Sequence, residues 1–364
     1  MTKIKIVIAA GGTGGHIFPA LGLANNLIKD NYDIRLTTDA RGLKYLQNNN
    51  EINFVKIPSS PLVKRNIFTL VKSILIICYS IVKSIILLSI NRPYLVLGMG
   101  GYSSFPICIA AVILKIKIII YENNLIVGKA NKYLLSFAEK VFVSYKDLEG
   151  ITENNKKKII EIGNIIREEI INFKNYKDFE DKYENFNILI LGGSQGAKVF
   201  AEKLPHVFKK LKNSGISLKV FQQCQLNQKE ELSNFYKKEN IKFELFNFTN
   251  KITEYYSKTN LVITRSGASA LGELINVNIP FIAVPLPTAA DNHQYENAKY
   301  YEKKGLCFLL EEKNIPNQLY GLIQSNFKDK TKINRIISNQ RQYSDKDVFN
   351  ELKINIKKII NEKN

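Results

Sequence analysis

The 364-residue sequence is poor in the side chains that build metal centres, with three histidines and four cysteines. No Cys-x-x-Cys pair occurs, so a structural zinc site is not expected. The cysteines stand far apart, mostly in apolar stretches typical of small buried residues: Cys78, Cys108, Cys224 and Cys307. The chain also starts with a strand pattern and shows no secretory signal, so we expect a cytoplasmic protein.

Motifs of nucleic-acid recognition are lacking, although the formal net charge is +19. The lysines are scattered, and no uninterrupted basic run is longer than Lys156–Lys158. No zinc pattern, RNP motif or basic-aromatic ladder accompanies them, so we expect no nucleic-acid partner. Either a lysine-rich composition or an anionic partner, such as a membrane surface, explains the charge.

Two glycine-rich turns organise the chain, and each follows an apolar strand pattern and precedes a helical one. They are Gly11–His16 and Gly192–Ala197. Glycines let the backbone approach a ligand closely, and the following helix offers N–H groups to an anion. The first turn does not complete a dinucleotide fingerprint, because Ile17 stands where the third glycine is required. The second turn lacks the Lys-Ser/Thr ending of a P-loop, so it is either a phosphate cradle without ATP hydrolysis or a plain strand–helix turn.

Strand and helix patterns alternate along both halves, which predicts an α/β protein with parallel sheets covered by helices. Leu95–Leu97 before Gly98 has a counterpart in Leu261–Thr264 before Arg265, so the halves repeat one order of strands and turns. The sequence therefore predicts two Rossmann-like domains facing each other across a cleft. We expect an N-terminal domain at 1–165 and a C-terminal domain at 166–344. An amphipathic helix at 345–364 should pack back onto the N-terminal domain.

The apolar segment 62–90 is interrupted by Arg65, Lys72 and Lys83, and we expect the two lysines to break any membrane-spanning window. On a helix the three charges share one stripe, because separations of seven and eleven residues return to nearly the same angle. The pattern predicts a helix lying on an anionic membrane surface, where each basic residue adds roughly 1 kcal/mol. The alternative is a buried crossover helix with its lysines in water.

The sharpest motif is Arg265–Glu273, at the end of a strand where α/β sheets bind ligands. Its small residues permit close approach, and Glu273 could accept hydrogen bonds from a ribose. An ordinary surface carboxylate is the alternative. A polar cluster, Asp291–Ala298, follows the next strand.

Six motifs, in this order, resemble the MurG family, the bacterial N-acetylglucosaminyltransferases that form lipid II: GGTGGH, GMGGY, YENN, GGSQGA, RSGA with a later Glu, and DNHQ-x-x-NA. The resemblance spans nearly the whole chain. It implies the GT-B fold and inverting transfer of N-acetylglucosamine from UDP-GlcNAc to the C4 hydroxyl of the muramoyl sugar of lipid I. It also implies a peripheral protein of peptidoglycan synthesis at the cytoplasmic face of the cell membrane. With no clear Asp-x-Asp motif, we expect no metal and no other cofactor.

The resemblance also implies roles for single residues. Glu273 would hold the ribose, while Arg265 and the backbone near Thr249 would frame the uridine. Ser194 and Arg167 would contact the diphosphate. Further contacts to UDP-GlcNAc are implied for Thr13, Gly14, Asn124 and Gln294. The acceptor side would include Thr13, His16 and the run Gly100, Gly101 and Tyr102.

His16 is the candidate general base, because a helix N-terminus disfavours the charged imidazolium and leaves a neutral ring to accept a proton. Glu122 is a second candidate, and a histidine that only ties the loop is the alternative. The second glycine turn, its helix dipole and Arg167 would stabilise the leaving UDP. The family's pattern has other residues where this chain has Tyr121, Ile165 and His293, so any role of those positions is in doubt.

Three other functions stay open. An epimerase or another UDP-sugar enzyme would share the two-domain plan. A nicotinamide-dependent oxidoreductase would use Asp39, after the second strand, to hold a ribose. A non-catalytic nucleotide-binding protein at the membrane would tolerate the loss of His16.

Overall fold

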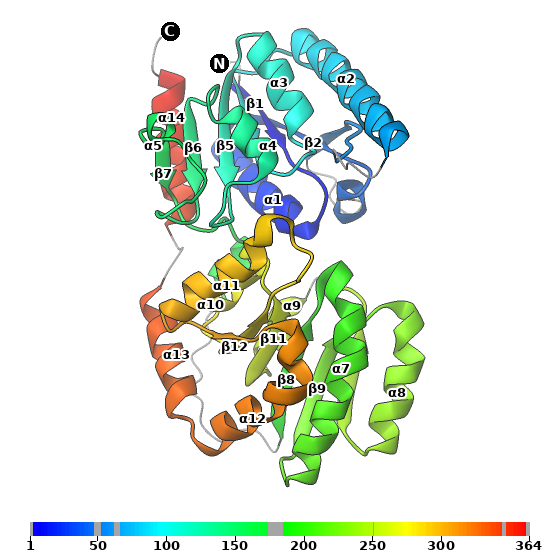
Figure 1. The fold of residues 1–364 in the computed structure, drawn as a ribbon. Helices are drawn as coiled ribbons and strands as arrows, with labels where there is room; N and C mark the ends of the chain where they lie inside the picture. Colours follow the sequence, from blue (N-terminus) through cyan, green and yellow to red (C-terminus); the bar gives the residue numbers. More distant parts are fainter. Residues whose placement is uncertain are drawn as a thin grey trace. The chain divides into compact units, whose positions relative to one another are not determined.

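The structure, a computed structural model, describes residues 3–46, 52–61, 66–173, 185–249, 251–343 and 347–361, with only the backbone for 194–197. The chain divides into two compact units: the N-terminal unit comprises residues 1–167 with 345–364, and the C-terminal unit residues 168–344. Each unit contains a parallel sheet with helices on both faces, as the alternating patterns predict (Figure 1).

Within its described residues, the N-terminal unit has seven strands in the order β3-β2-β1-β4-β5-β6-β7, all parallel to their neighbours. The strands are β1 (Lys5–Ala9), β2 (Asp33–Thr38), β3 (Asn53–Lys56), β4 (Leu95–Gly98), β5 (Lys117–Glu122), β6 (Lys140–Val143) and β7 (Ile159–Glu161). The helices are α1 (Gly14–Lys29), α2 (Ile67–Ile90), α3 (Phe105–Ile113), α4 (Lys129–Leu134), α5 (Glu153–Lys156) and α14 (Val348–Asn361), with the short 3-10 helix η1 (Gly42–Tyr45).

The strand order of this sheet reverses between β1 and β4, which pair directly. In open parallel sheets the crevice at the carboxyl ends of such strands is where ligands bind. One face of the sheet packs against α2, α3 and α4 through buried residues such as Val96, Ile107 and Leu134. The strands are buried on both faces, which is why they appear in the sequence as continuous apolar runs.

Helix α14 belongs to the N-terminal unit, although it follows the C-terminal unit in sequence. Lys353 on this helix forms an ion pair with Asp30 at 3.2 Å. At the end of the helix, the Tyr94 hydroxyl donates to the Ile360 carbonyl at 2.6 Å, and Lys117 Nζ donates to the Ile359 carbonyl at 3.1 Å. The helix therefore ties the end of the chain to the start of β4 and β5.

The C-terminal unit repeats the plan, with six parallel strands in the order β10-β9-β8-β11-β12-β13 among its described residues. The strands are β8 (Phe186–Leu191), β9 (Leu218–Gln223), β10 (Lys242–Phe246), β11 (Leu261–Arg265), β12 (Phe281–Val284) and β13 (Phe308–Leu309). The helices are α6 (Glu168–Ile171), α7 (Gly193–Asn213), α8 (Lys229–Lys238), α9 (Ile252–Tyr256), α10 (Ala268–Asn276), α11 (His293–Lys303), α12 (Ile315–Lys328) and α13 (Thr331–Gln342), with η2 (Leu226–Gln228), η3 (Ala290–Asn292) and η4 (Glu312–Asn314).

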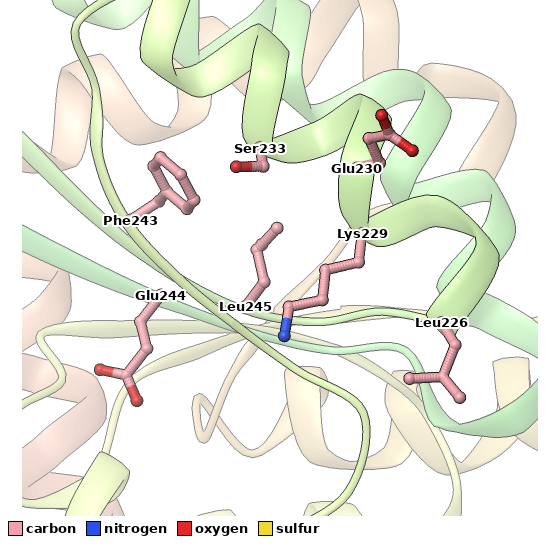
Figure 2. A pocket seen from close by; sticks show the side chains of 7 residues that line it. All are labelled: Leu226, Lys229, Glu230, Ser233, Phe243, Glu244 and Leu245. Atoms are coloured by element: carbon pink, nitrogen blue, oxygen red, sulfur yellow. The ribbon is translucent and has the colours of Figure 1, made fainter.

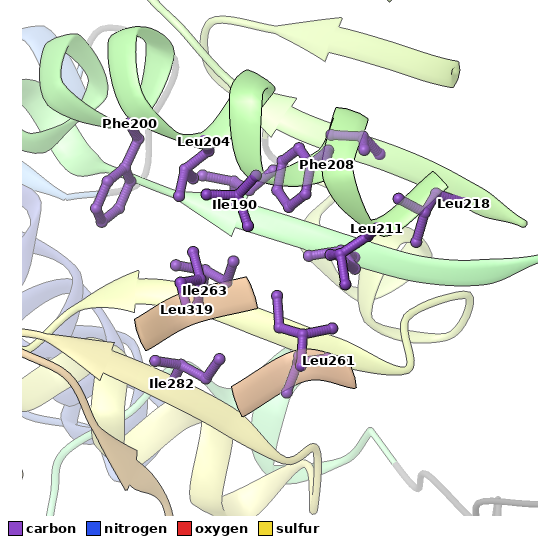
Figure 3. Packing of buried hydrophobic residues seen from close by; sticks show 14 of the residues in the cluster. Ile190, Phe200, Leu204, Phe208, Leu211, Leu218, Leu261, Ile263, Ile282 and Leu319 are labelled. Atoms are coloured by element: carbon purple, nitrogen blue, oxygen red, sulfur yellow. The ribbon is translucent and has the colours of Figure 1, made fainter. Parts of the chain in front are cut away.

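The core of the C-terminal unit lies where α7 and α12 cover β8, β11 and β12. Figure 3 shows Phe208 of α7 and Leu319 of α12 among the buried side chains that meet Ile263 of β11. The order reverses between β8 and β11, so the second glycine turn occupies the same place in this sheet as the first does in the other. The predicted repeat of the two halves is confirmed by this common topology.

Helix α2 differs from the alternative of a buried crossover helix. Its inward face carries three buried serines, Ser73, Ser80 and Ser84, together with the buried Leu88, and Ser80 donates to the Pro58 carbonyl at 2.6 Å. Its outward face is apolar, with Phe68 83% and Leu75 64% exposed. The expectation of a buried crossover helix is therefore wrong, because the side chains directed away from the protein are the apolar ones.

The two lysines do not break a membrane-spanning window in α2. An 18-residue window of the helix has a mean hydropathy of 2.3 and only 22% of it is buried, so the helix is long and apolar enough to cross a membrane. In the structure its serine face packs against the rest of the unit, next to α3 (Figure 1). Arg65, the third member of the expected basic stripe, lies outside the described residues, while Lys72 is exposed and Lys83 half-buried. Cys78, on this helix, is exposed rather than buried.

Candidate active site

The first glycine turn leads into α1 earlier than the sequence predicts. The helix begins at Gly14, so Gly14, Gly15 and His16 form its first turn and Pro19 lies inside it. Thr13 is the N-cap residue and is exposed. Two glycines and a proline weaken the helical signal in the sequence, and contacts with the neighbouring loop compensate for it in the fold.

The ring of His16 packs against the loop that follows β4. Its Nδ1 lies 3.0 Å from the carbonyl oxygen of Met99. A carbonyl can only accept a hydrogen bond, so Nδ1 carries the proton and the lone pair of the neutral ring belongs to Nε2. A Cβ on Gly101 would lie 3.4 Å from Nε2, and one on Gly100 3.4 Å from Cε1. Both glycines have positive φ, 72° and 85°, so glycine is required for backbone conformation as well as for space.

The carboxylate of Glu122, at the end of β5, is fully engaged by the loop that follows it. Oε1 accepts from the backbone N–H and the side chain of Asn124, both at 3.0 Å. Oε2 accepts from the Gly128 N–H and from Asn131 Nδ2, both at 2.9 Å. Glu122 is 3% exposed, and these four hydrogen bonds occupy both of its carboxylate oxygens. The geometry gives Glu122 the task of shaping the loop around Asn124.

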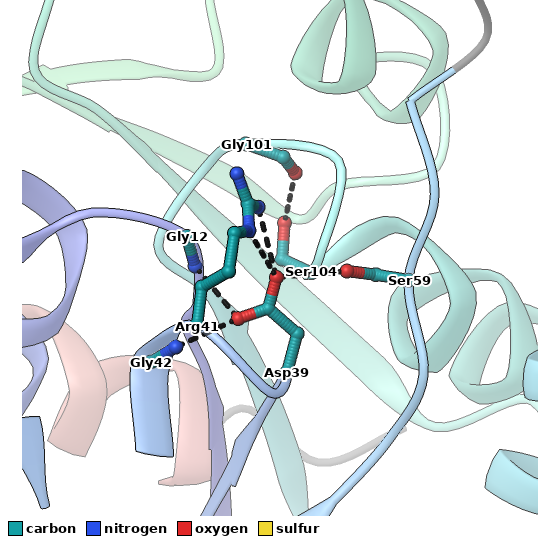
Figure 4. Close-up of polar contacts among 7 residues, drawn as sticks. All are labelled: Gly12, Asp39, Arg41, Gly42, Ser59, Gly101 and Ser104. Atoms are coloured by element: carbon teal, nitrogen blue, oxygen red, sulfur yellow. Dashed lines mark hydrogen bonds and ion pairs between the residues drawn. The ribbon is translucent and has the colours of Figure 1, made fainter. Parts of the chain in front are cut away.

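A second buried carboxylate, Asp39, joins three segments of the N-terminal unit (Figure 4). Its Oδ1 accepts from the N–H groups of Gly12 at 3.0 Å and Gly42 at 2.9 Å. Its Oδ2 accepts from Arg41 Nε and Nη2 at 3.0 and 2.8 Å, and from the Ser59 hydroxyl at 3.0 Å. Burial alone would raise the pKa of Asp39, but these hydrogen bonds outweigh it and the pKa is lowered.

Tyr121 has a structural task on the other side of β5. Its hydroxyl is 2.8 Å from the Ser144 hydroxyl and accepts from the Ile165 N–H at 3.0 Å. The side chain is 2% exposed. Tyr121 therefore fastens the segment that leads out of the N-terminal unit, a task in which a proton-transferring group is not needed.

Arg167 is the last residue of the N-terminal unit. Its guanidinium carbon lies 5.1 Å from the ring centroid of Phe18, which in turn meets Tyr45 edge-on at 5.5 Å. Phe18 is also the residue that a Cβ on Gly14 would strike, at 2.8 Å. Arg167, Phe18 and the first turn of α1 therefore form one contact chain.

In the C-terminal unit, the second glycine turn is held by a glutamine from the neighbouring strand. The Gly193 N–H donates to Gln223 Oε1 at 3.1 Å, and Gln223 Nε2 donates to the Asn247 carbonyl at 3.1 Å. Thr249 follows shortly and accepts from the Lys251 N–H through its hydroxyl at 3.0 Å. The side chain of Ser194 lies outside the described residues. Helix α7 begins at this turn, and its first turn has no acidic residue, which suits an anion.

Arg265 is directed into the protein. Its Nη1 donates to the carbonyls of Val284 and Pro285 at 3.3 and 3.1 Å, and its Nη2 forms an ion pair with Glu312. The guanidinium carbon lies 4.7 Å from the ring centroid of Phe200. Arg265 therefore joins the ends of β11 and β12, so any effect on a ligand acts through the loops that it holds.

The remaining expected residues of the C-terminal unit lie at the same edge of the sheet. Glu273 is half-buried on α10, in the second turn after Gly267. Gln294, half-buried at the start of α11, accepts from the Leu286 N–H through Oε1 at 3.0 Å and so shapes the loop after β12. Most of the expected residues thus follow the carboxyl ends of strands at or next to the reversal point of their sheet, whereas Thr249 follows the edge strand β10 and Arg167 the edge strand β7.

A shallow pocket of about 490 Å³ lies elsewhere in the C-terminal unit, between α8 and the edge strand β10 (Figure 2). It is lined by Leu226, Lys229, Glu230, Ser233, Phe243, Glu244 and Leu245. None of the expected site residues contributes to it, and it adjoins neither glycine turn.

Several residues that shape the two sites belong to no motif recognised in the sequence: Arg41, Asn131, Gln223 and Glu312. Gln223 and Glu312 act through partners distant in sequence, as Glu312 does with Arg265, whereas Arg41 acts through Asp39 two residues away. The signal available for Arg41 was its place two residues after Asp39 at the end of a strand.

Comparison with known proteins defines the class. Residues 6–143 match the glycosyltransferase family 28 N-terminal domain, and residues 187–352 match the glycosyltransferase family 28 C-terminal domain. The protein is therefore a glycosyltransferase built from two α/β domains.

Three similar proteins narrow this class. The UDP-N-acetylglucosamine–N-acetylmuramyl-(pentapeptide) pyrophosphoryl-undecaprenol N-acetylglucosamine transferase of Pelagibacter ubique is 35% identical over 98% of this chain and 99% of its own. The Rickettsia canadensis protein of the same name is 40% identical over 85% of this chain and 87% of its own. The crystal structure of Acinetobacter baumannii MurG has a TM-score of 0.79 at 25% identity, covering 98% of this chain and all of its own. The chain belongs to the MurG family, as its motifs predict, and has the GT-B fold.

Proposed function

We propose that the protein transfers N-acetylglucosamine from UDP-GlcNAc to the C4 hydroxyl of the muramoyl sugar of lipid I, forming lipid II. The names of its relatives support these two substrates. The observation that carries the chemistry is the 3.0 Å contact between His16 Nδ1 and the Met99 carbonyl, which in the neutral ring leaves the lone pair on Nε2. Nε2 lies beside Gly101, which has no side chain to cover it.

In the proposed reaction, His16 Nε2 takes the proton of the acceptor hydroxyl as its oxygen attacks C1 of the donor sugar. The bond from C1 to the diphosphate breaks on the opposite face, so the configuration at C1 inverts. The electron pair leaves with UDP. The N–H groups at the start of α7 and the Arg167 guanidinium stabilise this charge. Glu122 positions Asn124 beside the donor sugar, and we assign it no proton transfer.

The donor contacts follow the strand ends of the C-terminal unit. Glu273 accepts from the ribose hydroxyls, the backbone near Thr249 borders the uridine, and Arg265 holds the loops around it. Ser194 contacts the diphosphate, and Gln294 the sugar. Gly14 contacts the donor, and on the acceptor side Thr13 and the Gly100–Tyr102 loop accompany His16.

The hydrogen bonds of Asp39 argue against the oxidoreductase alternative. It requires the Asp39 carboxylate to accept from a ribose, but both of its oxygens already accept hydrogen bonds from the protein. Titration with UDP-GlcNAc and with NADH checks this point: we expect binding of the first and none of the second.

We also propose that α2 attaches the protein peripherally to the cytoplasmic face of the membrane. Its exposed apolar residues include Phe68, Leu75, Val82 and Ile86, with Lys72 on the same outward surface. Apolar side chains in the headgroup region and lysines near anionic lipids both favour binding.

The membrane proposal is tested by vesicle sedimentation. Lys72→Glu with Lys83→Glu should weaken binding to anionic vesicles, and Leu75→Glu should weaken binding to neutral ones too. The control is Lys328→Glu with Lys332→Glu, two exposed lysines of the C-terminal unit. Equal binding by all variants would refute the proposal.

The decisive test of the proposed activity is transfer of labelled GlcNAc to a lipid I analogue. We expect labelled lipid II with free UDP as the second product. Hydrolysis of UDP-GlcNAc, or its epimerisation without transfer, would refute the proposed activity.

A further inference from the structure

The pair Asp39 and Arg41 takes no part in the proton transfer or in the stabilisation of UDP described above, yet Asp39 accepts from Gly12 of the first glycine turn. Asp39 is 3% exposed and its carboxylate accepts from four residues. Burying a carboxylate is costly unless it is paired and hydrogen-bonded. Hydrogen bonds from the first glycine turn, from η1 and from the segment after β3 compensate for the burial of this carboxylate.

The guanidinium of Arg41 stands at the surface of this cluster. Asp39 engages its Nε and one Nη2 hydrogen, two of the five N–H groups of an arginine. The guanidinium carbon lies 4.6 Å from the ring centroid of Tyr102, and Nη2 lies 3.0 Å from where a Cβ on Gly12 would be. The Arg41 side chain is nevertheless 48% exposed. A cation is thus held in one orientation beside the glycine turn, with part of its surface open to a ligand.

Arg41 and His16 border the same loop from two sides. His16 rests on Gly100 and Gly101, and Arg41 rests on Tyr102, the next residue. The Gly101 carbonyl accepts from the Ser104 hydroxyl at 3.0 Å, which fixes the turn between them (Figure 4). In a muramoyl sugar the C4 hydroxyl and the C1 substituent stand on opposite sides of the ring, so a sugar bound along this loop with its C4 hydroxyl at His16 would direct its C1 substituent toward Arg41.

We propose that Arg41 donates hydrogen bonds to the diphosphate of the lipid-linked acceptor, and that Asp39 is the positioning residue that holds it. A guanidinium matches phosphate oxygens in a fixed, planar geometry, which a lysine does not provide. Because Asp39 fixes the rotamer in advance, less side-chain freedom is lost on binding. This inference rests on the proposed function, since it takes the acceptor to carry a diphosphate.

The test measures kcat and both KM values for the wild type, Arg41→Ala, Arg41→Lys and Asp39→Asn. Arg41→Ala should raise the KM for a lipid I analogue about tenfold or more and leave the KM for UDP-GlcNAc unchanged. Arg41→Lys should recover only part of the loss. Asp39→Asn should also raise the acceptor KM. A double variant with both Asp39→Asn and Arg41→Ala should have the same acceptor KM as Arg41→Ala alone, because Asp39 acts through Arg41. The matched control is Arg92→Ala, an exposed arginine that donates to the Leu114 carbonyl.

A second acceptor, a muramoyl-peptide glycoside without the diphosphate, identifies the group that Arg41 contacts. With this glycoside as acceptor, the wild type and Arg41→Ala should have the same acceptor KM. An acceptor KM unchanged in Arg41→Ala, or changed equally for both acceptors, would overturn the proposal. If Asp39→Asn lowers the Tm without changing the acceptor KM, the positioning task is wrong. A wild type that transfers no sugar refutes the proposed function instead, so the two failures are distinguishable.

Discussion

The two glycine turns occupy equivalent places in their sheets but serve different purposes. In the N-terminal unit the glycines are crowded by protein: a Cβ on Gly11 would lie 2.6 Å from Ser103 Oγ, and one on Gly14 2.8 Å from Phe18. In the C-terminal unit a Cβ on Gly193 or Gly267 would meet no atom of the described residues within 4 Å. The first turn uses glycine to bring protein groups together, whereas the second leaves space beside the backbone.

Under the proposed function, this difference corresponds to a preformed acceptor side in the N-terminal unit and a donor site with free space in the C-terminal unit. Close packing around the first turn fixes His16 and Arg41 before any substrate arrives, which is the arrangement that favours proton transfer. In the proposed function, a nucleotide sugar would approach the backbone at Gly193 and Gly267, where the described residues leave space. Substitutions in the two turns should therefore fail in different ways.

The largest expected effect is that of His16→Ala. Loss of a general base costs about 10²- to 10⁴-fold in rate, so kcat for transfer to a lipid I analogue should fall by that order while the Kd of UDP stays unchanged. His206→Ala, an exposed histidine on α7, is the control and should retain full activity. Wild-type transfer by the His16 variant would show that the histidine only ties the loop.

Much of the fold was predictable because parallel strands buried on both faces appear as apolar runs ending in glycine turns. The start of α1 was not, since Gly14 and Gly15 are poor helix formers and the compensating contact, His16 with Met99, joins residues 83 positions apart. The cluster around Asp39 was not predictable either, because it also depends on a contact between distant residues: its partner Ser59 lies 20 positions away. In α2 the apolar pattern indicated a helix, but burial of serines through Pro58 and Ser60 decided which side faces the protein.

Gly267→Ala probes the open space of the C-terminal unit. Its backbone has φ of −68°, which alanine adopts without strain, so the free energy of unfolding should not fall. If the donor occupies the space, the added methyl should weaken UDP-GlcNAc binding about tenfold, measured by calorimetry. Gly321→Ala, on α12, also meets no described atom within 4 Å and should leave the Kd unaltered. Unimpaired binding in the Gly267 variant would mean that the donor lies elsewhere.

Gly101→Ala probes the crowded turn. Its φ of 72° costs an alanine about 1–2 kcal/mol, and the new methyl would lie 3.4 Å from His16 Nε2. We expect a lower free energy of unfolding together with a lower kcat, while UDP binding persists. Denaturant unfolding and transfer kinetics measure the two effects, and a variant with normal stability would contradict the assigned conformation.

The smallest effect is the pH dependence that Asp39 contributes. The pKa of Asp39 is lowered in the folded protein, so its stabilisation is complete above the unfolded pKa of about 3.9 and is lost as the pH falls through the folded value. The stability difference between wild type and Asp39→Asn should therefore be constant near neutral pH and shrink below about pH 4, as measured by guanidinium midpoints. Asp329, in the C-terminal unit, also has a lowered pKa, caused by hydrogen bonds from Thr331 at the start of α13. Because Asp329 is exposed and joins only its own turn, Asp329→Asn should change the midpoints less at every pH, and an equal change would mean that Asp39 does not hold three segments together.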